Sequence, residues 1–174
     1  LLACGRPSWL ATRERLQHLL TDEAHAAALG PELVDRAEVV HHLPFEVADY
    51  VDFYSSEQHA RNVADILFRD PTELPASWRH LPIGYHGRAG TVVISGTDVV
   101  RPCGQRKARS AQAPSFGPTQ RLDLEAEVGF LVGTSSPLGS FVPTTAFADH
   151  VFGVVLVNDW SARDLQAWES TPLG

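Results

Sequence analysis

Polar and apolar residues alternate in two stretches of the chain, as they do in a strand with two different faces. In the first stretch, Tyr50, Asp52 and Tyr54 share one face of an extended run, and Val51 and Phe53 share the other. The first face carries a carboxylate and two phenols, which is too polar for an ordinary core strand. We therefore interpret this face as part of an active site and the opposite face as part of the core.

The second alternation, residues 121–132, predicts the clearest strand in the chain. Its polar face carries Asp123, Glu125 and Glu127, and its other face carries Leu122, Leu124, Ala126, Val128, Phe130 and Val132. Two residues of strand rise span about 6.6 Å, so Glu125 and Glu127 can converge on one ion between them. The wetted face of an antiparallel strand is the alternative explanation of the same pattern.

An apolar run at residues 151–157 predicts a buried strand that ends at Asp159. Ser161 is then expected to cap a new helix. On that helix Arg163 and Gln166 fall one turn apart, so their side chains lie on the same side.

Helical spacing begins shortly after the first alternation, at Ala60, Val63, Ala64 and Leu67. It predicts a helix from about Ser56 to Phe68, with Ser55 and Gln58 as a capping box. His59 then lies in the first turn, where backbone N–H groups favour the neutral imidazole that a general base requires. A surface histidine beside a cap is the alternative, and the polar face of the adjoining strand favours the base.

Five other segments have weaker patterns. Residues 8–20 predict an amphipathic helix, 24–37 a loop or a second short helix, and 38–45 an extended run. A hairpin is expected over residues 91–102, and a long loop rich in proline, glycine and serine over 103–119.

Composition excludes several classes of protein. The 174 residues are 44% hydrophobic and carry a net charge of −7, which indicates a soluble globular chain and argues against a nucleic-acid partner. No apolar run approaches the ~20 residues of a membrane span, and no secretory signal is visible. Cys4 and Cys103 have no metal-ligand spacing, so we expect free thiols and a cytoplasmic location. The chain has no methionine, and we expect it to be a fragment cut at both ends.

The acidic residues raise an electrostatic question. If Asp52, Glu125, Glu127 and Asp159 meet, each pair of carboxylates at ~4.5 Å repels by about 4 kcal/mol at an effective dielectric constant near 20. Three resolutions remain open: most are protonated, they do not meet, or a divalent cation lies among them. An all-oxygen ligand set would indicate Ca2+ or Mg2+ rather than zinc.

Four motifs together resemble the fumarylacetoacetase (fumarylacetoacetate hydrolase) family. They are the runs DYVDFYSSEQH at residues 49–59, LPIGYHGR at 81–88, LDLEAE at 122–127 and NDWSARD at 158–164. The second run is a glycine-punctuated loop that lacks the features of a nucleotide site. The resemblance extends from about Leu10 to Gly174.

The segments themselves predict an α+β, β-rich fold without repeated βαβ units. The resemblance implies a mixed β-sandwich-like roll, of which residues 45–174 are the first part of the catalytic domain. Residues 1–44 would then be the end of a small N-terminal domain and its linker.

The resemblance also implies an activity and a site. The activity is metal-dependent hydrolysis of 4-fumarylacetoacetate, a small dicarbonyl acid, to fumarate and acetoacetate at the end of tyrosine and phenylalanine catabolism, by a homodimer when complete. The cation would be held by Asp52, Glu125, Glu127 and Asp159. His59 would take a proton from water, and the substrate would be bound by Tyr54, Arg69, Tyr85, Arg163 and Gln166.

Two rival hypotheses stay open. One is another enzyme of the superfamily acting on a related dicarbonyl acid, such as an acylpyruvate hydrolase, an isomerase or a decarboxylase. The other is a non-catalytic β-domain with a structural Ca2+. The family places a substrate-contacting tyrosine at Ser170, and a lysine and a glutamate of its site beyond Gly174. We therefore expect the 174-residue chain by itself to be inactive and prone to associate.

Overall fold

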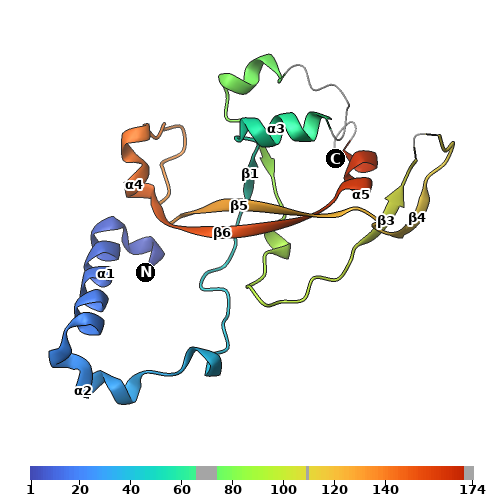
Figure 1. The fold of residues 1–174 in the computed structure, drawn as a ribbon. Helices are drawn as coiled ribbons and strands as arrows, with labels where there is room; N and C mark the ends of the chain where they lie inside the picture. Colours follow the sequence, from blue (N-terminus) through green and yellow to red (C-terminus); the bar gives the residue numbers. More distant parts are fainter. Residues whose placement is uncertain (66–73, 109, 171–174) are drawn as a thin grey trace. The chain divides into compact units, whose positions relative to one another are not determined.

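The computed structural model has a mixed α/β fold with small antiparallel sheets (Figure 1). The structure describes residues 1–65, 74–108 and 110–170. The chain forms two compact units. The first unit comprises residues 1–39 and 102–166, and the second comprises residues 40–101 and 167–174.

A long two-stranded ribbon is the main element of the first unit. Strand β5 (Leu122–Val132) pairs antiparallel with β6 (Val151–Ala162), from Leu122 opposite Ala162 to Val132 opposite Val151. Both strands were predicted, and β6 extends further than expected. Ser161 therefore lies inside β6, so its predicted role as a helix cap is wrong. The pairing continues because Arg163 N–H bonds Arg121 O at 2.9 Å, and helix α5 (Arg163–Glu169) begins only there.

Helix α1 (Arg6–Thr21) confirms the amphipathic helix predicted at residues 8–20. It begins earlier because Pro7 occupies its first turn, where a missing N–H costs nothing. Trp9 is buried and packs edge-on against Phe152 of β6, with ring centroids 5.3 Å apart. A Cβ at Gly133 would lie 2.7 Å from the Trp9 ring, so this position needs glycine. Trp9 thus fastens α1 to the ribbon.

Short elements complete the first unit. The segment 24–37 holds the predicted second short helix. The run predicted to be extended at residues 38–45 continues into the second unit and forms no strand. Residues 103–119, expected to be a loop, contain a hairpin of β3 (Cys103–Arg106) and β4 (Ser115–Pro118). The remaining short helices are η1 (Leu2–Cys4), η2 (Glu23–His25), α2 (Ala26–Leu29), η3 (Gly30–Glu32), η4 (Arg36–Glu38), η8 (Thr144–Ala146) and α4 (Phe147–His150).

In the second unit, strand β1 (Val51–Phe53) pairs antiparallel with β2 (Gly84–His86). Two short helices, η6 (Ala76–Arg79) and η7 (Ala89–Thr91), flank β2 in sequence. The hairpin predicted over residues 91–102 is wrong, because residues 92–102 form no strand. Their chain instead turns at Gly96, whose φ of 90° is in the left-handed region that glycine adopts readily.

Helix α3 (Glu57–Val63) follows β1 and confirms a helix start near Ser56. The cap is Ser56, whose Oγ accepts from the His59 N–H at 3.3 Å, so the predicted cap pair of Ser55 and Gln58 is wrong. The end of the predicted helix, at residues 66–68, lies outside the described residues.

Burial in the described residues is sparse. Trp9, Ala60 and Leu165 are the buried apolar residues there. Val51 and Phe53 are about half exposed, at 52% and 53%, so the predicted core face of the first strand is wrong. The predicted burial of residues 151–157 is wrong as well, since Leu156 is 89% exposed. Two-stranded sheets bury little surface by themselves.

None of the helices in the described stretches is long and apolar enough to cross a membrane.

Candidate metal and catalytic site

The register of β5 and β6 gathers carboxylates on one face of the ribbon. Glu125 lies opposite Asp159, and Asp123 lies opposite Ser161. Directly opposed residues of an antiparallel pair point to the same side, and so do alternate residues of one strand. We call this surface the acidic face; it consists of Asp123, Glu125, Glu127, Asp159 and Ser161. Apart from Asp123, its residues are half-buried.

Arg163 binds one end of the acidic face. Its Nε donates to Asp123 at 2.9 Å, its Nη2 donates to Glu125, and its Nη1 donates to Gln166 at 3.0 Å. Ser161 Oγ adds a bond to the second oxygen of Glu125 at 3.0 Å. Burial lowers the pKa of Arg163, but the hydrogen bonds to Glu125 and Asp123 outweigh burial and raise that pKa above its ordinary value. The guanidinium thus stays charged and fixes Glu125 in place.

Glu127 and Asp159 form the other end of the acidic face. Their carboxylate oxygens lie within 4.8 Å of each other, and both residues are half-buried. Two such charges repel by about 3.5 kcal/mol at an effective dielectric constant near 20. A divalent cation would convert that repulsion into attraction. Because the donors are oxygens, the chemistry suits Ca2+ or Mg2+.

Asp164 fixes the start of α5 next to this site. Its carboxylate accepts hydrogen bonds from Thr119 Oγ1 and from the Gln120 N–H, the latter at 2.9 Å. Burial raises the pKa of Asp164, but these bonds outweigh burial and lower that pKa below its ordinary value. Thr119 is 2% exposed, so the anchor is well shielded. The position of Arg163 therefore depends on a carboxylate one residue away.

In the second unit, the pairing of β1 with β2 brings Tyr85 next to Asp52. The two residues are register partners, and Tyr85 OH donates to Asp52 Oδ2 at 2.6 Å. A Cβ at Gly84 would lie 2.8 Å from the main-chain oxygen of Asp52, so glycine allows the strands to approach there. Strand β2 was not predicted from the sequence, because it has only three residues. Its one available signal is the run Gly84–His86, which is too short to show a period.

Tyr54 lies beside His59, with ring centroids 6.5 Å apart in an edge-on arrangement. Tyr54 OH donates to Ala60 O at 3.2 Å, and the Trp78 indole donates to Tyr54 O at 2.7 Å. Ala60 is completely buried. The contacts of Tyr54 with His59 and Ala60 attach the end of β1 to the start of α3, and the bond from Trp78 attaches it to η6.

Glu57 strengthens the start of α3 in a way that sequence patterns did not reveal. Its carboxylate binds Arg61 and Arg79, each at 2.8 Å. The hydrogen bond from Arg61 is the main cause of a lowered pKa at Glu57. Arg79 lies far along the sequence in η6, so only the fold identifies it as a partner.

The structure assembles the predicted site residues in two groups. The first unit holds Glu125, Glu127, Asp159, Arg163 and Gln166. The second unit holds Asp52, Tyr54, His59 and Tyr85. Arg69 lies outside the described residues. Asp123 and Ser161 were not predicted to contribute, although their alternation with Glu125 and Asp159 in the sequence was visible.

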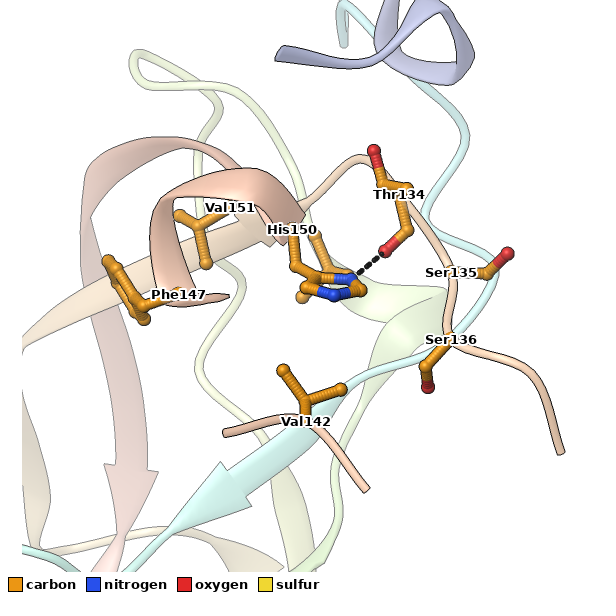
Figure 2. A pocket seen from close by; sticks show the side chains of 8 residues that line it. Thr134, Ser135, Ser136, Val142, Phe147, His150 and Val151 are labelled. Atoms are coloured by element: carbon orange, nitrogen blue, oxygen red, sulfur yellow. Dashed lines mark hydrogen bonds between the residues drawn. The ribbon is translucent and has the colours of Figure 1, made fainter. Parts of the chain in front are cut away.

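A separate hollow lies at the other end of the ribbon (Figure 2). Val142, Phe147 and Val151 supply its apolar wall, and His150 binds Thr134 O at 2.9 Å beside it. Between Glu125 and Val132 the strand rises about 23 Å. The hollow is therefore distinct from the acidic face.

Comparison with known proteins identifies relatives across the whole chain. The family model described as "Fumarylacetoacetate (FAA) hydrolase C-terminal" matches residues 49–174. Fumarylacetoacetase of Caenorhabditis elegans is 48% identical over 180 residues, which covers 99% of this chain and 43% of the relative. The Homo sapiens fumarylacetoacetase is 45% identical over 179 residues, covering 99% and 42%. The chain thus spans about two fifths of the length of these relatives.

Proposed function

Because this chain belongs to the fumarylacetoacetate hydrolase family, we propose that it carries part of the active site of a fumarylacetoacetase. Such an enzyme hydrolyses 4-fumarylacetoacetate to fumarate and acetoacetate, the last step of tyrosine and phenylalanine catabolism. Relatives with this name are 48% and 45% identical to the chain. The observation that carries the proposal is the half-buried pair of carboxylates of Glu127 and Asp159, within 4.8 Å of each other.

We propose that Asp52 joins Glu125, Glu127 and Asp159 in holding Ca2+ or Mg2+. The donors are carboxylate oxygens, and bonds from Ser161 and Arg163 orient Glu125 as an outer shell orients a metal ligand. When bound, the cation would supply positive charge that binds and polarises the two oxygens of a 1,3-dicarbonyl. Tyr85 would orient Asp52 through their 2.6 Å hydrogen bond.

His59 would act as the general base. In this role its imidazole takes a proton from water, and the water oxygen adds to the carbonyl carbon under attack. The bond between that carbon and the acetoacetate carbon then breaks, and the departing carbon receives a proton. The contact between Tyr54 and His59 supports this role because it fixes the first turn of α3 relative to β1.

The substrate is a dianion, so we propose that hydrogen-bond donors surround it. Arg163 supplies guanidinium N–H groups, and Gln166 is bonded to it at 3.0 Å. The Tyr54 and Tyr85 hydroxyls, which now donate to Ala60 O and Asp52, would turn to the substrate when it binds. Arg69 completes the proposed set by resemblance to the family.

We further propose the family's β-sandwich-like roll, with residues 45–174 in the catalytic domain and 1–44 at the end of an N-terminal domain. The enzyme would act as a cytoplasmic homodimer. The family model matches residues 49–174, and this supports a catalytic domain that begins close to residue 45.

The test is an assay of a full-length protein that carries this sequence, supplied in parallel with fumarylacetoacetate and an acylpyruvate. We expect fumarate and acetoacetate as products, loss of turnover with a chelator, and recovery with Ca2+ or Mg2+. Faster turnover of the acylpyruvate would favour the related superfamily enzymes. Cation binding without turnover of either compound would favour a non-catalytic domain.

A further inference from the structure

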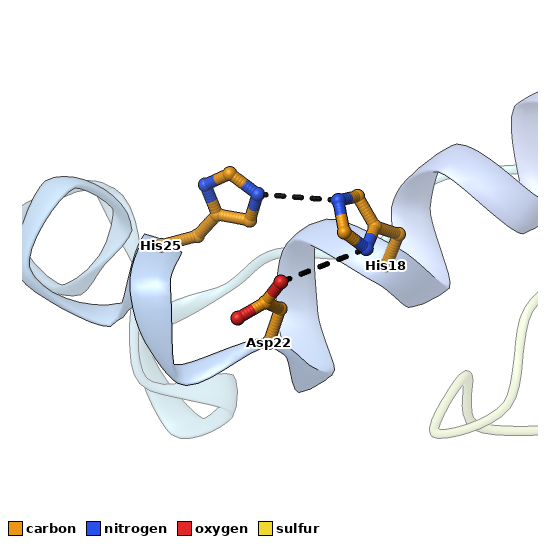
Figure 3. Close-up of side chains that lie close together, drawn as sticks. All are labelled: His18, Asp22 and His25. Carbon is orange, nitrogen blue, oxygen red and sulfur yellow. Dashed lines mark hydrogen bonds and ion pairs between the residues drawn. The ribbon is translucent and has the colours of Figure 1, made fainter.

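A cluster of metal-binding side chains lies in the first unit, outside the proposed catalytic site. His18 is in the last turn of α1, Asp22 caps that helix, and His25 ends η2 (Figure 3). We call these three residues the histidine cluster. One ligand atom from each lies within 4.8 Å of the other two. The proposed hydrolysis uses none of them.

The two imidazoles have the spacing that a shared metal requires. Their Nε2 atoms are 3.4 Å apart, and their rings meet edge-on with centroids 5.1 Å apart. Two nitrogens bound at 2.0–2.1 Å to a tetrahedral Zn2+ lie about 3.4 Å from each other. The observed separation matches that figure. Without a metal, the same contact is a long hydrogen bond between one protonated and one bare nitrogen.

Asp22 is close enough to act as the third ligand, because one of its carboxylate oxygens lies within 4.8 Å of a ring nitrogen of each histidine. Its Oδ1 accepts from the Ala24 N–H at 2.9 Å, and its Oδ2 lies 3.9 Å from His18 Nδ1, the ring nitrogen that does not face His25. Ligating carboxylates are commonly held in this way by a second hydrogen bond. The carbonyl end of α1 adds negative potential, which favours a cation at this position.

We propose that the histidine cluster binds a divalent transition-metal ion, with Zn2+ the best fit, and that water completes the coordination. Two imidazoles and one carboxylate suit Zn2+ better than Ca2+ or Mg2+. The site therefore differs in ligand chemistry from the acidic face. His18 and Asp22 side chains are 54% and 42% exposed, so the ion would exchange with solvent.

Zinc titration of a full-length protein carrying this sequence tests the proposal. Excess Mg2+ is present throughout to compete for the carboxylates of the acidic face. Calorimetry should detect one equivalent of Zn2+ that EDTA removes, and Co2+ in its place should give the visible absorption of tetrahedral coordination. His25→Gln should weaken Zn2+ binding at least tenfold, and lower pH should weaken it because protons compete for imidazole nitrogen.

His41→Gln is the matched control, since His41 is an exposed histidine outside the cluster. It should leave Zn2+ binding unchanged, and circular dichroism should show both variants folded. Equal Zn2+ affinity in His25→Gln and the parent protein would overturn the proposal. Loss of Zn2+ binding in Glu127→Gln but not in His25→Gln would also overturn it, because the ion would then use the acidic face. Zinc affinity and cobalt absorption are both measured without reference to hydrolytic activity.

Discussion

His59 is the residue on which the proposed chemistry depends most. It lies in the first turn of α3, next to Tyr54. In a full-length protein, His59→Ala should lower the rate of fumarylacetoacetate hydrolysis by about 100-fold or more, because no other group would take the proton from water. Binding of Ca2+ or Mg2+ should persist. Steady-state kinetics and a cation titration measure the two effects.

The exposed His42 provides a control for the loss of an imidazole. His42→Ala should retain the parent rate. Turnover by His59→Ala within a few-fold of the parent protein would exclude His59 as the general base.

Glu127 allows a test of the metal site that does not require turnover. Glu127→Gln keeps the shape of the side chain and removes one of two charges within 4.8 Å. Without divalent ions, the variant should be as stable as the parent or more stable, since like-charge repulsion is gone. With Ca2+ or Mg2+, the parent should gain thermal stability and the variant should gain much less.

Thermal unfolding with and without the ion measures both effects, and Glu169→Gln is the control because Glu169 is exposed. The assignment of Glu127 as a ligand fails if the ion raises the melting temperature of both variants equally.

At the level of residues, the sequence predicted which side chains share a strand face, but it did not predict their hydrogen-bond partners. The alternation of Glu125 and Glu127 placed both on one face, and the register confirms it. The bonds of Arg163 to Asp123 and Glu125 could not be predicted, because they depend on which residue of β6 lies opposite each residue of β5. That register is a property of the pair and not of either strand.

The start of α5 should lose stability in acid through Asp164. Hydrogen bonds lower the folded-state pKa of this carboxyl, so its contribution is present above the ordinary aspartate value of about 4 and is lost as pH falls through the lowered folded pKa. Asp164→Asn should therefore destabilise the protein at pH 7. The difference between variant and parent should shrink below pH about 4.

Chemical denaturation across pH measures this difference. Asp98→Asn, which changes an exposed aspartate, is the comparison and should show a smaller difference at pH 7. A destabilisation by Asp164→Asn that is the same at pH 7 and pH 3 would contradict the anchoring role of its charge.

The pairing of β1 with β2 can also be tested at the level of secondary-structure elements. In Gly84→Ala the new Cβ would meet the main-chain oxygen of Asp52 at 2.8 Å, so the strands must separate. We expect a cost of about 1–3 kcal/mol, the usual range for overpacking, and a weaker bond between Asp52 and Tyr85. Gly90→Ala is the matched control, since nothing lies within 4 Å of a Cβ there.

Thermal unfolding should show a lower melting temperature for Gly84→Ala and little change for Gly90→Ala. Equal melting temperatures in the two variants would mean that β2 does not approach β1 as closely as the structure shows.

The predictability of elements followed their length. The helix at residues 8–20 and the strand at 121–132 span several periods, and both were predicted. Strands β2, β3 and β4 have three or four residues each and contain glycine, so no period could be read from them. Their pairing is set by contacts between strands, which local patterns do not contain.

At the scale of the molecule, the first unit joins residues from both sides of the second unit in sequence. Trp9 packs on Phe152, a contact between residues far apart along the chain. An amphipathic pattern in α1 indicates that the helix has an apolar side, but it does not say which strand that side meets. The side chains that share one face of β5 were therefore predictable, and the packing of α1 on the ribbon was not.

The apolar face of the β5–β6 ribbon has a consequence for the behaviour of the 174-residue chain. It lies opposite the acidic face, and Val128, Val154 and Leu156 are 55%, 57% and 89% exposed on it. Contiguous exposed apolar surface of this kind favours association.

We expect the isolated chain to self-associate as its concentration rises. Leu156→Thr should reduce this association and keep the strand, since threonine has high β-propensity. Leu138→Thr is the control: Leu138 is 106% exposed but lies outside both strands, so its loss should change association little. Sedimentation velocity over a range of concentrations measures the outcome, and a monomeric parent chain throughout that range would show that the ribbon face does not drive association.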